Sequence, residues 1–298
     1  MRSAQVIRSA VALLAAAITL AMLPISATAE EPQARGAYLV TTIGACGNCH
    51  TPRNPSGEAI PGMELAGGFA FEEKLLGKTV GPNITPHPET GIGNWSEAQI
   101  VISLRDGKRP DGSIIGPPMP IPAYRGLSDG DAAAIAAYLR SLKPVRNAVA
   151  KSQYKVPLPQ AYGPAVTHVD EPPRADKVAY GRYLAGPVGH CVLCHTAPGG
   201  GKPFDMTRAY QGGRELPDFP DPGALTVSRN ITADTEHGIG KWSDAEIKRS
   251  IVEGVRPDGT RLSRTMPFAA YAQMTSDDLD AVVAFFTHAE AAAVIIAS

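Results

Sequence analysis

Two short cysteine motifs carry the most specific chemistry in this sequence. All four cysteines fall in two Cys-x-x-Cys-His motifs. The first comprises Cys46, Cys49 and His50, and the second comprises Cys191, Cys194 and His195. This spacing is typical of c-type haem attachment, in which two thiols form thioethers with one haem and the histidine ligates its iron. The motifs therefore predict two covalent haems, with His50 and His195 as axial ligands.

Other uses of paired cysteines compete with this interpretation. A redox disulfide usually lies on a thioredoxin-like strand–helix unit, which the pattern around the motifs lacks. Two Cys-Cys-His sets could each bind zinc with one added ligand, and exported chains often use paired cysteines as disulfides. Because both motifs end in histidine and both begin a repeated segment, haem attachment is favoured.

The chain contains an internal duplication. Gly36 to Leu39 recurs as Gly181 to Leu184, and the two cysteine motifs share the same offset of 145 positions. Further matches have an offset of 147, which one net two-residue insertion explains. These are residues 83–85 and 230–232 (Asn-Ile-Thr), 91–96 and 238–243 (Gly-Ile-Gly-x-Trp-Ser), 109–112 and 256–259 (Arg-Pro-Asp-Gly), 119–120 and 266–267 (Met-Pro), and 123–124 and 270–271 (Ala-Tyr). A period this long predicts tandem domains rather than a solenoid.

The duplication sets the expected domain boundaries. We expect a signal peptide over 1–29, a first domain over 30–146, a Pro-rich linker over 147–176 and a second domain over 177–290. The stretch 143–176 contains six prolines. Such a segment is either an extended, semi-rigid spacer or a strap across both domains.

Two methionines match each other across the repeats. Met119 and Met266 are each followed by proline, and they lie 69 and 71 residues after His50 and His195. A loop methionine otherwise most often fills a core. The matched positions predict distal ligands, and His/Met ligation raises the reduction potential and fills the sixth position of the iron, as electron transfer requires.

Other repeated residues have less specific expected roles. Trp95 and Trp242 are expected to be buried near the haems. Arg109 and Arg256 precede turns, and they could bind haem propionates or simply be solvated turn residues. Tyr124 and Tyr271 follow the methionines and could position those loops. The unmatched histidines are expected to be surface or loop residues: His87, His168, His190, His237 and His288.

The regular structure is predicted to be mainly helical. Capping boxes at 96–99 and 243–246 each precede a helix of about ten residues ending near Gly107 or Gly254. Ser128 and Thr275 are predicted N-caps of a last amphipathic helix in each repeat. Strand signals are weak throughout.

The N-terminus and the charge indicate an exported protein. Arg2 and Arg8, an apolar run over 10–23 and the Ala-Thr-Ala at 27–29 are typical of a cleaved signal peptide, with an uncleaved anchor as the alternative. With 28 basic and 29 acidic residues, a polybasic nucleic-acid binder is excluded. No second hydrophobic run reaches spanning length. We expect a periplasmic protein with no membrane span in the mature chain, and peripheral membrane association stays open.

Taken together, the repeated strings resemble the multihaem cytochrome c subunits of bacterial periplasmic dehydrogenases that oxidise alcohols, sugar acids such as gluconate, aldehydes or N-heterocycles such as nicotinate. The resemblance covers nearly all of the mature chain in two copies. It implies tandem helical cytochrome c domains, each wrapped around one covalent haem, with His50 and His195 proximal and Met119 and Met266 distal. Many members carry three haems and a membrane anchor, whereas this sequence has two motifs, which favours a soluble shuttle or a loosely bound subunit.

Two functions follow from these expectations. The first is a dihaem electron carrier, with no catalytic activity of its own, that takes electrons from a donor dehydrogenase and passes them to a downstream cytochrome or oxidase. The second is a dihaem enzyme, such as a peroxidase or a thiosulfate-type oxidoreductase, which needs an iron with an open or labile position. Both repeats retain the methionine, which favours the carrier. A purely structural or binding module would leave the haem motifs unexplained.

Overall fold

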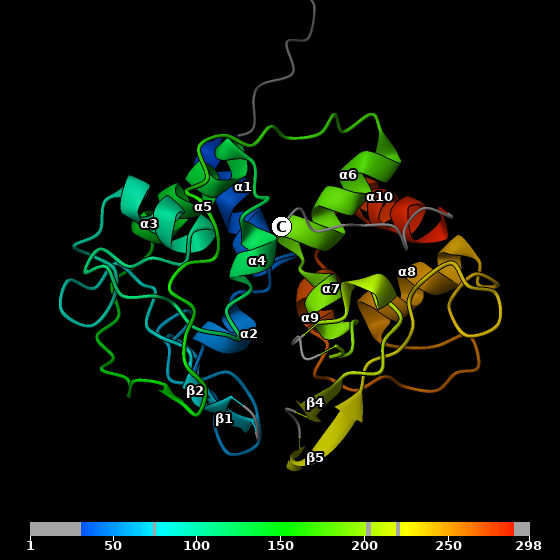
Figure 1. The fold of residues 1–298 in the computed structure, drawn as a ribbon, viewed down its shortest axis with the longest axis horizontal. Helices are drawn as coiled ribbons and strands as arrows, with labels where there is room; N and C mark the ends of the chain where they lie inside the picture. Colours follow the sequence, from blue (N-terminus) through cyan, green and yellow to red (C-terminus); the bar gives the residue numbers. More distant parts are fainter. Residues whose placement is uncertain (1–30, 74–75, 201–203, 219–220, 289–298) are drawn as a thin grey trace, which may run out of the picture. The chain divides into compact units, whose positions relative to one another are not determined.

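Helices dominate the fold, and the two repeats form them in the same order (Figure 1). The computed structural model describes residues 31–73, 76–200, 204–218 and 221–288, so the predicted signal peptide lies outside the described residues. The first repeat contains α1 (Pro32–Thr41), α2 (Gly47–His50), α3 (Glu97–Arg105), α4 (Ile121–Tyr124) and α5 (Asp129–Ser141). The second contains α6 (Lys177–Tyr183), a π-helical turn (Leu184–Val188), α7 (Cys191–Cys194), a 3₁₀ turn (Met206–Arg208), α8 (Asp244–Glu253), α9 (Phe268–Tyr271) and α10 (Ser276–Thr287). The mainly helical prediction is confirmed.

Two small antiparallel sheets accompany the helices. The strands are β1 (Ala70–Glu73), β2 (Gly77–Val80), β3 (Gln153–Tyr154), β4 (Glu215–Asp218) and β5 (Asp221–Val227). The first sheet has the order β1-β2-β3, and the second is the β4–β5 pair. In the first sheet, Gly77 pairs with Tyr154, so a strand of the Pro-rich segment completes a hairpin of the first repeat. The weak strand signals of the sequence did not reveal these elements.

The predicted helix ends are found where the sequence places them. Ser96 and Ser243 each cap their helix through a complete capping box, α3 and α8 respectively. Gly254 follows α8 in the left-handed conformation (φ 65°), and Gly107 has the same conformation (φ 64°) just beyond α3. Ser128 and Thr275 cap α5 and α10 through their side-chain oxygens. Local sequence therefore fixes the helix boundaries.

The first and last helices of each repeat cross at a glycine. In Figure 1, α1 lies against α5 and α6 lies against α10. An added Cβ at Gly36 would lie 2.0 Å from the carbonyl oxygen of Ala134. An added Cβ at Gly181 would lie 1.8 Å from the carbonyl oxygen of Ala281. No side chain fits at either crossing, so each repeat depends on glycine there.

The Pro-rich segment is fastened to the first repeat. The Tyr162 hydroxyl donates to the carbonyl oxygen of Ile115 (2.8 Å), and the Asp129 amide donates to the carbonyl oxygen of Val169 (2.9 Å). The two repeats and this segment lie in one compact unit over residues 31–298. The segment thus behaves as a strap on the first repeat, and the exact domain boundaries stay a prediction. Within the described ranges, no helix is long and apolar enough to cross a membrane.

We predict that Gly36→Ala lowers the free energy of unfolding by about 1–3 kcal/mol, because the methyl group would overpack the α1–α5 crossing. Chemical denaturation of the holoprotein, followed by circular dichroism, measures this change. Gly130→Ala is the control, because an added Cβ on this residue of α5 has no heavy atom within 4 Å. The control is expected to be neutral or stabilising by up to about 1 kcal/mol. Equal losses in both variants would contradict the packing explanation.

Candidate functional site

Both cysteine motifs lie on short helices that start from the same unusual backbone conformation. Ala45 and His190, the residues before the first cysteine of each motif, both have φ 43°. A non-glycine residue with positive φ is uncommon and usually persists only where the surroundings enforce it. The same conformation at two equivalent positions marks these turns as features of a functional site.

Each motif histidine is held by a backbone carbonyl. The Nδ1 atom of His50 lies 2.8 Å from the carbonyl oxygen of Pro82. The Nδ1 atom of His195 lies 2.7 Å from the carbonyl oxygen of Arg229, 147 positions after Pro82. A carbonyl can only accept, so Nδ1 carries the proton and Nε2 keeps its lone pair. Burial lowers the pKa of both imidazoles, which favours the neutral form that ligates metals.

A buried asparagine fixes the segment that supplies the first of these carbonyls. Asn83 directly follows Pro82, and its Oδ1 accepts from the backbone amide (2.9 Å) and hydroxyl (2.7 Å) of Thr85. Its Nδ2 donates to the carbonyl oxygen of Val145 (2.8 Å). The repeated Asn-Ile-Thr string therefore has a structural function, which is to hold the carbonyl that orients His50.

The cysteines are not activated for thiol chemistry. All four, in both motifs, are free of disulfide bonds. Burial raises the pKa of Cys46 and Cys191 to about 12, whereas a reactive cysteine has a lowered pKa. Among the described residues, no three His, Cys, Asp or Glu side chains are grouped as a metal site of those ligands requires. The raised pKa values do not favour the redox-disulfide alternative.

A tyrosine follows each methionine and lies close to the cysteine motif of its repeat. Met119 and Met266 immediately precede α4 and α9, whose last residues are Tyr124 and Tyr271. Burial raises the pKa of Tyr124 far above its usual value, and the neighbouring Cys46 thiol adds to the rise. In the second repeat, burial and the neighbouring thiols of Cys191 and Cys194 raise the pKa of Tyr271 in the same way. Each tyrosine therefore follows its methionine in the chain and lies close to its cysteines, and its role in positioning the methionine loop stays a prediction.

The repeated tryptophans are less buried than predicted. Trp95 and Trp242 are half-buried and pack against the hydrophobic core. Each directly precedes the N-cap serine of a helix, where the chain runs along the surface. The predicted burial is therefore only partial, and packing of these tryptophans on the haems stays a prediction.

The repeated arginines are occupied by their own turns. Arg109 donates through Nη1 to the hydroxyl of Ser113 (3.3 Å) and to the carbonyl oxygen of Ile114 (2.8 Å). Arg256 lies 3.6 Å from the carboxylate of Asp258. Of the two roles left open by the sequence, these contacts support the turn residue.

The unmatched histidines lie on the surface or in loops, as predicted. His168, His237 and His288 are exposed, and His87 is half-buried in a loop. His190 is half-buried in the loop before α7, and its ring packs edge-on against Tyr124 with ring centroids 5.8 Å apart. Burial lowers the pKa of His190 to about 4. This contact joins the second repeat to the first, so no pattern within one repeat could reveal it.

Two arginines near the motifs were not predicted from the sequence. Burial raises the pKa of Cys49 to about 11, and the positive charge of Arg53 opposes part of that rise. Arg214 has the same effect on the raised pKa of Cys194. The Arg53 guanidinium also donates to the side-chain oxygen of Asn48 (3.2 Å). The proximity of Arg53 to its motif in the sequence was the only available signal.

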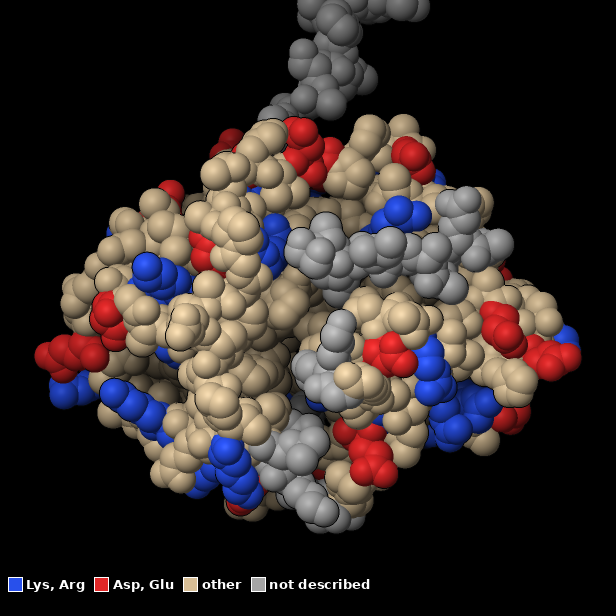
Figure 2. Space-filling model, in the orientation of Figure 1, with Lys and Arg blue, Asp and Glu red and all other residues tan. Residues whose placement is uncertain are grey.

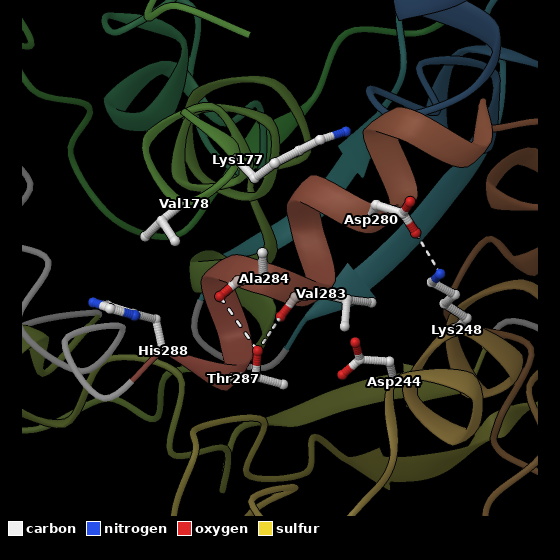
Figure 3. Close-up of a pocket in the computed structure, with 9 residues that line it drawn as sticks. All are labelled: Lys177, Val178, Asp244, Lys248, Asp280, Val283, Ala284, Thr287 and His288. Atoms are coloured by element: carbon white, nitrogen blue, oxygen red, sulfur yellow. Dashed lines mark hydrogen bonds and ion pairs between the residues drawn. The ribbon is translucent and has the colours of Figure 1, made fainter. Parts of the chain in front are cut away.

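A pocket near α6, α8 and α10 lacks comparable chemistry. Figure 3 shows Lys248 paired with Asp280 on its wall, and Lys177 pairs with Asp277 nearby (3.4 Å). Because these cations already have carboxylate partners, the pocket has the character of an ordinary solvated surface.

Comparison with known proteins agrees with this geometry. A family model described as cytochrome c matches residues 33–143. A dihaem c-type cytochrome of Cereibacter sphaeroides is 31% identical over 226 residues, which cover 72% of this chain and 71% of the relative. The chain belongs to the cytochrome c family. Membership implies haem c as the cofactor and electron transfer as the activity.

Other relatives of this cytochrome are subunits of larger assemblies. The cytochrome c subunit of the quinone-dependent alcohol dehydrogenase of Gluconobacter oxydans is 31% identical over 233 residues, covering 74% of this chain and 46% of the relative. The gluconate 2-dehydrogenase cytochrome c subunit of Pantoea cypripedii is 28% identical over 235 residues, covering 74% and 50%. This cytochrome therefore spans about half the length of these curated relatives, which are electron-transfer rather than catalytic subunits.

The residues present fit a haem at each motif. Two thiols lie on one turn of helix, and the adjacent imidazole is neutral, oriented through Nδ1 and able to ligate through Nε2. A methionine loop follows in each repeat, and a buried tyrosine lies close to the cysteines. The donor set is therefore the one that haem c requires.

We predict that Asn83→Ala lowers the free energy of unfolding of the holocytochrome by about 1–3 kcal/mol, because it leaves buried amide and carbonyl groups without partners. Denaturant titration monitored in the Soret region measures this loss. Asn94→Ala is the control, since Asn94 is exposed and donates only to the carbonyl oxygen of Pro88. A surface substitution of this kind should change stability by less than about 0.5 kcal/mol. Similar values for the two variants would contradict the role given to Asn83.

Proposed function

We propose that this cytochrome is a dihaem electron-transfer subunit of the periplasm, which accepts electrons from a dehydrogenase and passes them to a respiratory acceptor. The observation that carries the proposal is the duplicated contact between a motif histidine and a backbone carbonyl, at equivalent positions of both repeats. The same ligand orientation, built twice, supports two haems with similar proximal coordination.

The proposal assigns a role to each predicted ligand. Cys46 and Cys49 attach the first haem, and Cys191 and Cys194 attach the second. His50 and Met119, and His195 and Met266, are the axial pairs. When bound, haem c supplies reversible one-electron chemistry. The protein orients the ligands, excludes water and sets the potential through burial and hydrogen bonding.

Contacts that hold both methionine loops support a carrier over an enzyme. In the first repeat, Tyr162 of the strap donates to the carbonyl oxygen of Ile115, four residues before Met119. In the second, the hydroxyl of Thr265 donates to the carbonyl oxygen of Pro217 in β4 (3.1 Å). A tethered methionine loop favours an iron that keeps its sixth ligand, whereas a dihaem enzyme needs one iron whose sixth ligand can leave.

The names of the similar proteins support a dehydrogenase as the electron donor. Those named above are cytochrome c subunits of alcohol and gluconate dehydrogenases, so a donor dehydrogenase is the partner we propose, with a downstream cytochrome or oxidase as acceptor. On the face shown in Figure 2, basic and acidic side chains are interspersed. Such a surface suits transient protein docking and does not offer the single-sign patch typical of nucleic-acid binders.

We predict that replacing both cysteines of one motif with alanine lowers the haem content from two to one per chain, because each motif attaches its own haem. Intact-protein mass spectrometry of the Cys46→Ala, Cys49→Ala double variant, and of the Cys191→Ala, Cys194→Ala double variant, measures this. A wild-type mass with fewer than two haems would contradict the dihaem assignment.

We predict that the visible spectrum of the dithionite-reduced protein does not change on addition of carbon monoxide, because methionine occupies the sixth position of both irons. Met266→Ala should open one iron, so that about half of the haem then shifts. Met119→Ala should give the same result at the other iron. If half of the wild-type haem binds carbon monoxide, one site is labile and the dihaem enzyme becomes the better assignment.

A further inference from the structure

The last helix of each repeat has an unusual N-terminal cap. In an ordinary capping box, the side chain at the third helical position accepts directly from the N-cap amide. This occurs in α3, where the Ser96 amide donates to Gln99 (2.9 Å), and in α8, where the Ser243 amide donates to Glu246 (2.8 Å). In α5 and α10 the third position is an aspartate, which is one methylene shorter. A hydroxyl group from elsewhere in the chain fills the gap.

That hydroxyl comes from a tyrosine of the other repeat. At α5, the Ser128 amide donates to the Tyr183 hydroxyl (3.1 Å), and this hydroxyl donates to the carboxylate of Asp131 (2.7 Å). At α10, the Thr275 amide donates to the Tyr38 hydroxyl (3.1 Å), which donates to the carboxylate of Asp278 (2.7 Å). Each repeat thus completes the helix cap of the other.

The two tyrosine contacts are equivalent to each other, as the two halves of a two-fold symmetric interface are. Tyr38 and Tyr183 are equivalent at the offset of 145, and Asp131 and Asp278 are equivalent at the offset of 147. In an isologous interface, the same patch on both partners makes both halves of the contact. The duplication has placed such an interface within one chain, and we call these two contacts the tyrosine locks.

The lock at α5 is buried, whereas the lock at α10 is only partly buried, because Tyr38 is half-buried and Thr275 is exposed. Asp131 is 2% exposed, Asp278 5% and Tyr183 5%. The carboxylate of Asp131 also forms a two-point ion pair with Arg35 (2.8 and 2.9 Å). Hydrogen bonds to buried charged groups are stronger than neutral ones, and a lost partner is not replaced by water.

The segments that lead into the two motifs touch beside the locks. An added Cβ at Gly189 would lie 3.2 Å from the side chain of Ile43, and one at Gly126 would lie 2.8 Å from the side chain of Pro187. The ring of His190 packs on Tyr124, as described above. Both cysteine motifs therefore start from one shared contact region, and their mutual placement depends on the register of the two repeats.

We propose that Tyr38 and Tyr183 are positioning residues that hold the two haem-attachment segments in one register, so that electrons pass between the haems over a fixed distance. This inference rests on the proposed function, because it requires one haem on each motif. The tyrosines take no part in the redox chemistry and act only through the geometry of the repeats.

The test is the distribution of haem–haem distances in the fully oxidised holoprotein, measured by pulsed electron paramagnetic resonance. Tyr38→Phe, Tyr183→Phe and the double variant remove only the hydroxyls. The wild type should give one narrow distribution. Each single variant should broaden it, the double variant should broaden it most, and opening of the interface should become roughly tenfold more frequent per lock. Electron equilibration between the haems should slow in the same order.

Ser103→Ala is the matched control. It loses one buried hydroxyl hydrogen bond of similar length (2.7 Å), to the carbonyl oxygen of Ile100 within α3 of the first repeat. It should keep the wild-type distance distribution even where its thermal stability falls. A double lock variant that also keeps the wild-type distribution, and is merely less stable, would overturn the positioning role.

Counting haems by mass in every sample separates this inference from the function on which it rests. Fewer than two haems in the wild type would refute the proposed function. The locks would then be judged by small-angle X-ray scattering of the same variants. A radius of gyration unchanged in the double variant would overturn the locks, and an increase that Ser103→Ala does not share would support them.

Discussion

The close crossing of the first and last helices in each repeat is the constraint on which the rest of the structure depends. At Gly36 and Gly181 the backbone of one helix lies directly against that of the other, with no room for a side chain. This contact places α1 and α6 against the last helices, and the cysteine motifs follow within a few residues of their ends. It also sets the first helix beside the N-terminus of the last. Ligand placement and contact between the repeats thus depend on the same two glycines.

The site is built as much from backbone as from side chains. A carbonyl orients each histidine, and a buried asparagine holds the segment that supplies the first carbonyl. Side chains then complete the surroundings, with Tyr124 and Tyr271 close to the cysteines. Since backbone geometry depends less on side-chain identity, two repeats that have diverged widely keep the same arrangement.

Features encoded locally could be predicted from the sequence. The motifs, the capping boxes at Ser96 and Ser243 and the helix ends at Gly107 and Gly254 are set by a few adjacent residues, and the structure has them in place. Features that join distant segments could not be predicted. The strand at 153–154, the packing of His190 on Tyr124 and the exchange of tyrosines between helix caps each need a partner that only the tertiary fold identifies. The aspartates at 131 and 278 resembled ordinary first-turn acids.

The strap has a consequence for dividing the chain. Its residues add a strand to the hairpin of the first repeat, reach its methionine loop through Tyr162 and bind Asp129 at the start of α5. A single-haem fragment that ended at the last helix, near residue 142, would expose all of these sites. A first half that kept these contacts with the strap would have to extend to about residue 169. The segment repeated in the sequence is therefore shorter than the segment whose contacts stabilise the first half.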